Sequence, residues 1–170
     1  MFNVINRLFA GKSTTGRLIC HLGPPKAATT AFQEALQDVN LPNVRFLGTF
    51  QPRDRNKRGS IYSDIMDSIK TDPTQNDIDR IQLKIDRELK FGTDLIISEE
   101  MLLVNQSNAD FEQKLSRISQ IIGQYDCVIV VTLREPESAL KSLYSEIFFR
   151  QGTLPKISFE EFLSSSQARV

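Results

Sequence analysis

The chain has 170 residues, 40% of them hydrophobic and 25% charged, which is enough for one domain with a substantial buried core. Its 21 basic residues balance its 21 acidic residues, so no net field favours nucleic acid or an anionic membrane as a partner. Cys20 and Cys127 both lie inside apolar runs, and we expect them to be buried, reduced thiols.

Residues 1–16 are expected to form an extension that precedes the domain at 17–170. The apolar residues within 1–10 predict a short packing helix, with a weak membrane-surface anchor as the alternative, because the segment is too short to cross a bilayer. The GKST sequence at 11–14 looks like the end of a Walker A motif, but Asn6 stands where that motif requires its first glycine. We interpret GKST as a linker, and we expect no transmembrane segment and a cytoplasmic location.

Residues 17–36 (RLICHLGPPKAATTAFQEAL) combine three features that point to an anion site. The apolar run at 18–23 predicts a strand, and a turn rich in glycine and proline that carries Lys26 follows it. Thr29 and Thr30 then open an amphipathic helix predicted over 29–39. The start of a helix offers unpaired N–H groups and a positive dipole end, and Lys26 adds a full positive charge.

The middle of the chain predicts further strands at 44–47 and 94–98 and a helix at 77–90. Segments 51–60 and 71–75 are polar and are expected to be connectors. Glu99 and Glu100 follow the strand at 94–98 directly. The 51–60 segment is interpreted as a solvated loop, with steering of an anionic ligand as the alternative, on the basis of Arg53, Arg55, Lys57 and Arg58.

The last third of the chain predicts a helix at 110–122, a strand at 127–133 and helices at 139–149 and 158–163. The runs at 94–98 and 127–133 are continuously apolar, which is typical of strands buried on both faces of a parallel sheet. Glu161 stands three residues after Ser158, as in a capping box. The side chains of Phe148, Phe149 and Phe162 are expected in a core or an interface.

Alternating strands and helices predict an α/β fold, in which a parallel β-sheet is flanked by helices. Ligands of such sheets bind beyond the carboxyl ends of the strands. Lys26 follows the first strand, Glu99 and Glu100 follow the third, and Arg134 follows the fourth. A lysine, a carboxylate and an arginine are therefore expected to meet at one edge of the sheet.

The segment PPKAATTAFQEAL resembles the 5′-phosphosulfate loop, PKxGTT, of sulfotransferases that use 3′-phosphoadenosine 5′-phosphosulfate (PAPS). Arg134, followed by Pro136 and by Ser142 eight residues on, resembles that family's 3′-phosphate motif. The segments LIISEE and SFEEFL also look like parts of bacterial sulfotransferases. The resemblance covers most of residues 17–163 and implies a P-loop NTPase-like sulfotransferase architecture.

The resemblance implies a role for each matched residue. Lys26 would stabilise the departing phosphate, and Arg134 and Ser142 would bind the 3′-phosphate. No metal is expected, because sulfuryl transfer in line to a hydroxyl mainly requires positioning and charge stabilisation. The residues that would hold the 5′-phosphosulfate are Pro25, Lys26, Ala27, Ala28, Thr29 and Thr30.

One loop position departs from the family's pattern, and the identity of the general base differs between family members. The family's loop glycine is Ala28 here, and alanine disfavours a positive φ, so the loop is expected to form if this position is right-handed. Family members use histidine or glutamate as the general base. His21, the only histidine, lies within the first strand and is expected to be a hydrogen-bonded structural residue, so Glu100 is the expected base, with Glu99 as the alternative.

The expected function is transfer of a sulfuryl group from PAPS to a hydroxyl-bearing acceptor, which analogy with bacterial members suggests is a carbohydrate or glycolipid. Family domains usually extend further and carry more ligand contacts, so the chain looks like the N-terminal portion of such a domain or a shortened variant. One alternative is therefore a non-catalytic nucleotide-binding or interaction protein. The other is a small-molecule kinase that uses ATP and Mg²⁺. The sequence leaves the acceptor and the oligomeric state open.

Overall fold

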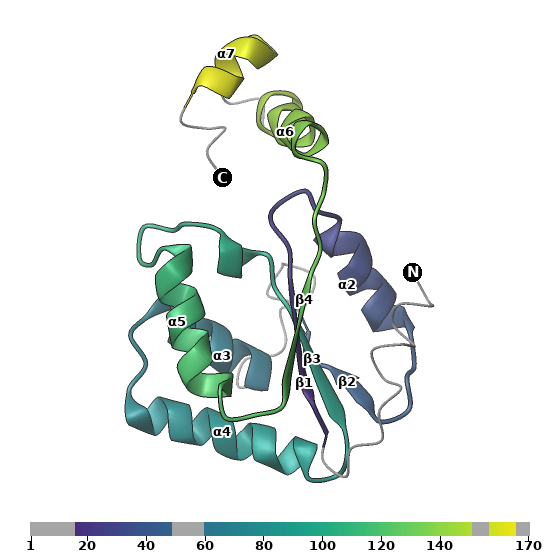
Figure 1. Ribbon diagram of the computed structural model, residues 1–170, viewed down its shortest axis with the longest axis vertical. Helices are drawn as coiled ribbons and strands as arrows, with labels where there is room; N and C mark the ends of the chain where they lie inside the picture. Colours follow the sequence, from purple (N-terminus) through teal and green to yellow (C-terminus); the bar gives the residue numbers. More distant parts are fainter. Residues whose placement is uncertain (1–15, 49–59, 151–156, 166–170) are drawn as a thin grey trace.

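The computed structural model describes residues 16–48, 60–150 and 157–165, which fold around a parallel β-sheet (Figure 1). The sheet has four strands in the order β2-β3-β1-β4, and each neighbouring pair is parallel. The predicted α/β class with a parallel sheet is confirmed, and each predicted strand ends within two residues of its observed bounds. The strands are β1 (Leu18–Leu22), β2 (Val44–Phe46), β3 (Asp94–Ser98) and β4 (Cys127–Val131).

Strand β1 lies in the interior of the sheet, with β3 on one side and β4 on the other. Leu18 stands opposite both Leu95 and Cys127. The start of the strand is anchored by Arg17, whose backbone N–H donates to Asp94 Oδ1 at 2.7 Å and whose Nη2 donates to Asp94 Oδ2 at 2.8 Å. The loop that leaves β1 therefore emerges between the residues that follow β3 and those that follow β4.

The helices begin close to their predicted positions. The capping box predicted at Ser158 and Glu161 is present, and Thr74 with Asp77 and Asp110 with Gln113 form two more. The predicted helices are α2 (Thr29–Asp38), α4 (Gln75–Leu89), α5 (Phe111–Ile122), α6 (Pro136–Ser145) and α7 (Phe159–Ser164), with a 3-10 turn η2 (Met101–Leu103) and a π-helical turn η3 (Glu146–Arg150) besides.

Helix α3 (Ile61–Lys70) is absent from the sequence prediction. It buries Ile61, Ile65 and Ile69, which recur every four residues along one face. Ser60 caps the helix, because its Oγ accepts the N–H of Ser63 at 3.1 Å. Both signals stand in the sequence: Ser60 is the last residue of the charged 51–60 segment, and the isoleucines follow it.

Both faces of the sheet are covered by helices. On one face, apolar side chains of β1 and β3 pack with α3, α4 and α5 in the larger core. On the other face, Phe32 and Leu36 of α2 pack against Ile19 and Ile96. The connections that leave β1 and β3 thus go to opposite faces, which is the arrangement that opens a crevice at the carboxyl edge of an α/β sheet.

Helix α6 differs from the prediction at both ends. It begins at Pro136 because the Glu135 carboxylate accepts the backbone N–H groups of Glu137 at 2.9 Å and Ser138 at 2.7 Å, and proline suits the first helical turn. It ends at Ser145, and the chain continues from Glu146 as η3. The predicted single helix at 139–149 is therefore an α-helix followed by a π-helical turn.

Helices α6 and α7 lie beyond the carboxyl edge of the sheet (Figure 1). An aromatic cluster joins them to η3. The Tyr144 ring lies 4.9 Å from Phe148 and 5.5 Å from both Phe159 and Phe162, between ring centres. Phe148 and Phe162 are buried, which confirms their predicted place in a core. The side chain of Phe149 lies outside the described residues.

Strand β4 is less covered than the sequence predicts. Ile129 and Val131 are 53% and 51% exposed, so the prediction that this strand is buried on both faces is wrong. The strand lies at the edge of the described sheet, and the helix-covered core includes neither of these two side chains. Cys20 is buried and Cys127 is half-buried, and both thiols are free, with their sulfur atoms 3.9 Å apart.

Several predicted features lie outside the described residues. These are the N-terminal segment 1–10, the GKST sequence at 11–14 and the basic side chains Arg53, Arg55, Lys57 and Arg58. Within the described ranges, the helices are too short or too polar to cross a bilayer.

Candidate anion-binding site

The loop after β1 is held against the ends of its neighbours by close packing at Gly23. A Cβ atom added to Gly23 would lie 2.4 Å from Thr132 Oγ1, beyond β4, and 2.6 Å from Thr29 Cγ2, at the start of α2. Real Cβ atoms do not approach other atoms this closely, so glycine permits the contact between β1, β4 and α2. The loop then turns sharply, because the Ala27 N–H donates to the Pro24 carbonyl at 3.1 Å.

Two loop residues adopt the left-handed backbone conformation. Lys26 has φ 70° and Ala28 has φ 63°. The condition stated for the loop, a right-handed Ala28, is therefore not met, and the loop forms with Ala28 in the left-handed conformation. Left-handed residues other than glycine cost about 1–2 kcal/mol each and are found where the surroundings hold them, often at functional sites.

The start of α2 carries no acidic side chain of its own helix. Ala28 is the N-cap and supplies no side-chain acceptor, and the first turn contains no aspartate or glutamate. The positive end of the helix dipole is therefore not neutralised from within α2. Thr29 is buried there, and its Oγ1 donates to Glu100 Oε2 at 2.8 Å, which places the residue after β3 at the start of this helix.

Arg134 reaches the Lys26 loop, as the sequence predicts for residues at the same sheet edge. Its Nη1 donates to the Lys26 carbonyl at 3.1 Å. Ser142, on α6, is half-buried, and no hydrogen bond joins it to Arg134 in the described part of the chain. The structure therefore joins Thr29 to Glu100 and the Lys26 loop to Arg134 at one edge of the sheet.

Lys26 also forms an ion pair that the sequence does not predict. Its Nζ contacts Glu146 Oε2, from the first residue of η3, and the two side chains are 23% and 35% exposed. The glutamate lies within the predicted helix at 139–149, and no motif or spacing singles it out. Its contact with Lys26 depends on where α6 ends and how η3 turns.

Glu99 is held in a buried hydrogen-bonded position. The Tyr62 hydroxyl, from α3, donates to its Oε2, and the Met101 N–H donates to its Oε1 at 2.9 Å. Burial raises the pKa of the Glu99 carboxyl, against the opposing effect of these two hydrogen bonds. Tyr62 was missed by the sequence reasoning together with α3; its position after the Ser60 cap is the signal that could have located it.

His21 is a buried structural residue, as expected. Its Nδ1 lies 2.7 Å from Ser98 Oγ and its Nε2 lies 3.2 Å from Thr132 Oγ1, so both ring nitrogens have partners. The ring centre lies 4.1 Å from that of Phe32. Burial lowers the pKa of His21 to about 4, so the imidazole is neutral at pH 7.

This pKa predicts an acid-sensitive contribution to stability. The unfolded chain takes up the histidine proton near pH 6.5 and the folded chain only near pH 4, so the free energy of unfolding falls as the pH drops through this interval, by about 3 kcal/mol. Urea unfolding of the wild type and of His21→Gln at pH 7 and pH 4.5 measures this loss of unfolding free energy. Because the chain has one histidine, the difference between the two proteins should shrink markedly at pH 4.5. An unchanged difference would contradict the assignment.

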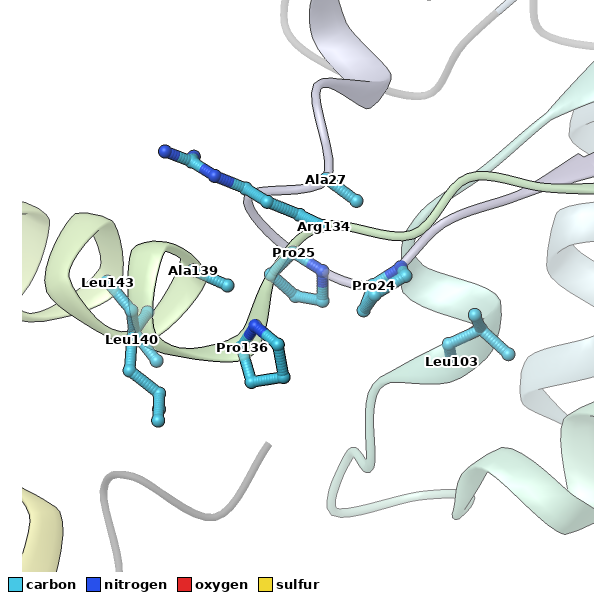
Figure 2. A pocket seen from close by; sticks show the side chains of 9 residues that line it. All are labelled: Pro24, Pro25, Ala27, Leu103, Arg134, Pro136, Ala139, Leu140 and Leu143. Atoms are coloured by element: carbon cyan, nitrogen blue, oxygen red, sulfur yellow. The ribbon is translucent and has the colours of Figure 1, made fainter.

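An apolar pocket of about 320 Å³ adjoins the loop (Figure 2). Figure 2 shows the Arg134 side chain extending away from Leu103 and the prolines. The site thus combines a cationic loop with an apolar surface. The pocket is lined by Pro24, Pro25, Ala27, Leu103, Arg134, Pro136, Ala139, Leu140 and Leu143.

No protein-family model, curated protein or solved structure matches this chain. The resemblance to sulfotransferases therefore stays a prediction that rests on the residues themselves.

Proposed function

We propose that this chain is a sulfotransferase domain that uses PAPS as the donor and transfers the sulfuryl group to a hydroxyl-bearing acceptor. The observation that carries the proposal is the hydrogen bond from Arg134 Nη1 to the Lys26 carbonyl. It joins the two motifs that the resemblance assigns to the two phosphate-bearing ends of one nucleotide. The finer P-loop-like sulfotransferase architecture is part of the same proposal.

The residues present fit a polyanionic nucleotide. Lys26 lies in the loop and Arg134 reaches it, and the first turn of α2 has no acidic residue of its own, although Glu100 contacts Thr29 there. The phosphosulfate end would be held by Lys26, Thr29, Thr30 and the backbone of residues 25–28, and the 3′-phosphate by Arg134 and Ser142. The bound nucleotide supplies an activated sulfuryl group, and the proposal includes no metal ion.

The chain's own residues divide the remaining work. Lys26 neutralises the charge that builds on the leaving phosphate. Glu100 takes the proton of the acceptor hydroxyl. Glu100 is favoured over Glu99 because both Glu99 oxygens already accept hydrogen bonds in a buried position, whereas Glu100 is half-exposed at the site.

The apolar pocket favours one class of acceptor. A free sugar presents hydroxyl groups on most of its surface and would leave many of them unpaired against proline and leucine side chains. A glycolipid presents a hydroxyl group together with an alkyl chain that such a wall can cover. We therefore propose a glycolipid, or another hydroxyl compound with an apolar body, as the acceptor.

Calorimetric titration of the purified chain with adenosine 3′,5′-bisphosphate, AMP and ATP tests the nucleotide class. The proposal expects the bisphosphate to bind clearly more tightly than AMP, because AMP lacks the 3′-phosphate. Preference for ATP with a requirement for Mg²⁺ would support the kinase alternative. Absence of binding to all three would support the non-catalytic alternative.

Replacing Arg134 by alanine tests the second phosphate contact. Loss of a charge-assisted contact should weaken bisphosphate binding by about 10- to 100-fold and leave AMP binding within about threefold. Arg80→Ala, on α4, removes an arginine that pairs with Asp64 and Asp77 instead and serves as the control. Equal losses for the bisphosphate and AMP would contradict a role at the 3′-phosphate.

A further inference from the structure

The ion pair between Lys26 and Glu146 places a carboxylate on the ammonium group that the proposed function assigns to the nucleotide. Glu146 is the first residue of η3 and belongs to the segment that begins with Arg134 and continues through α6. This segment contacts the loop twice at one residue, because Arg134 Nη1 donates to the Lys26 carbonyl while Glu146 pairs with the Lys26 side chain. The backbone of Lys26 is thus fixed while its charge is shared with an internal anion.

We propose that Glu146 is an internal competitor for the anionic ligand, so that the nucleotide binds only by taking Lys26 from this carboxylate. The proposal rests on the proposed function, since it assumes that the Lys26 loop binds the nucleotide. The Glu146 carboxylate pairs with the same ammonium group that a phosphate or sulfate oxygen of the ligand would need. It also repels a bound anion while it remains close.

The surrounding carboxylates have different partners. Glu135 caps the start of α6 through the N–H groups of Glu137 and Ser138, and Glu137 pairs with Lys141 one turn further along. Glu100 accepts a hydrogen bond from the Thr29 hydroxyl. Glu146, in contrast, forms its ion pair with the loop lysine.

The ion pair is weak enough that it lowers the affinity for the nucleotide without preventing binding. Both side chains are partly exposed, and ion pairs in such positions are weak enough to be displaced. An anion with one charged group gains little beyond the contact it must break. An anion that also reaches Arg134 gains a second contact, so Glu146 selects for ligands that carry two separated anionic groups.

Calorimetric titration of Glu146→Gln with adenosine 3′,5′-bisphosphate tests this inference, with Glu137→Gln as the matched control on the same segment. Glutamine keeps the size of the side chain and removes its charge. We expect Glu146→Gln to bind the bisphosphate about tenfold more tightly than the wild type, and Glu137→Gln to bind within about twofold of it. Circular dichroism should show the same fold for all three proteins.

The outcomes distinguish the role of Glu146 from the proposed function. Equal or weaker binding by Glu146→Gln, with clear binding by the wild type, would overturn the role of Glu146 and leave the proposed function standing. Binding by Glu146→Gln alone would support both. Absence of binding by every protein would overturn both, because the loop would then not take the nucleotide.

A double variant separates competition at Lys26 from a general charge effect. When Lys26→Met is already present, Glu146 has no ammonium group to occupy, so the gain from Glu146→Gln should fall to within about twofold. A full tenfold gain that persists without Lys26 would contradict competition for this lysine.

Discussion

Replacing Lys26 by methionine is expected to weaken binding of adenosine 3′,5′-bisphosphate about 100-fold. Methionine keeps a long unbranched side chain but removes the positive charge at the loop. The main cause of the loss is that the 5′-phosphate loses the cation that would pair with it. Calorimetric titration measures the change directly.

The matched control for Lys26→Met is Lys141→Met. Lys141 lies on α6 and is exposed, and it pairs with Glu137 instead of contacting the loop. Lys141→Met removes the same charge from the same region. If long-range attraction contributes little, this variant should bind adenosine 3′,5′-bisphosphate with an affinity within about twofold of the wild type. Equal losses for the two variants would show that Lys26 acts only through the overall field of the protein.

Replacing Gly23 by alanine is expected to lower the free energy of unfolding by about 3 kcal/mol. The added Cβ would lie 2.4 Å from Thr132 Oγ1 and 2.6 Å from Thr29 Cγ2, so both threonines or the loop itself must move. Moving Thr132 also disturbs its contact with His21 Nε2, at 3.2 Å. Urea unfolding monitored by circular dichroism measures the loss.

A control and a rescue variant accompany this prediction. Gly92 has φ 68° and no atom within 4 Å of its hypothetical Cβ, so Gly92→Ala should cost only about 1 kcal/mol. Adding Thr29→Ser to Gly23→Ala removes the Cγ2 atom and should restore part of the lost stability, since serine can keep the hydroxyl bond to Glu100. If Gly23→Ala had the same free energy of unfolding as Gly92→Ala, close packing at Gly23 would be contradicted.

The fold could be predicted because its strands are short apolar runs and its main helices have clear periodicity. Helix α3 shows how a clear local signal can be overlooked, since its isoleucines and its serine cap stand directly after a charged segment. The exposure of β4 could not be predicted in the same way. An apolar run shows that a strand can be buried on both faces. Whether helices cover both faces of that strand depends on how the whole sheet is packed.

The arrangement of Lys26, Glu100 and Arg134 at one edge could be predicted from topology alone. In a parallel sheet, residues that follow the strands must meet at the carboxyl edge, whatever the details of the loops. The left-handed Ala28 and the Glu146 contact belong to a different class of feature. Each depends on several distant groups that fix a backbone angle or the end of a helix, and neither leaves a pattern in local sequence.

The strand order has a consequence for how the chain reaches its native state. Every pairing in the described sheet involves β1 with β3 or β4, or β2 with β3, and β1 and β2 do not pair with each other. Among the described strands, no two that pair are therefore joined by a short connection, because even β2 and β3 are separated by α3 and α4. Folding must close a long loop before it gains its first interstrand hydrogen bonds, and contacts so distant in sequence are associated with slow folding. Until then, the apolar residues of β1 can be shielded only by contacts other than native strand pairing.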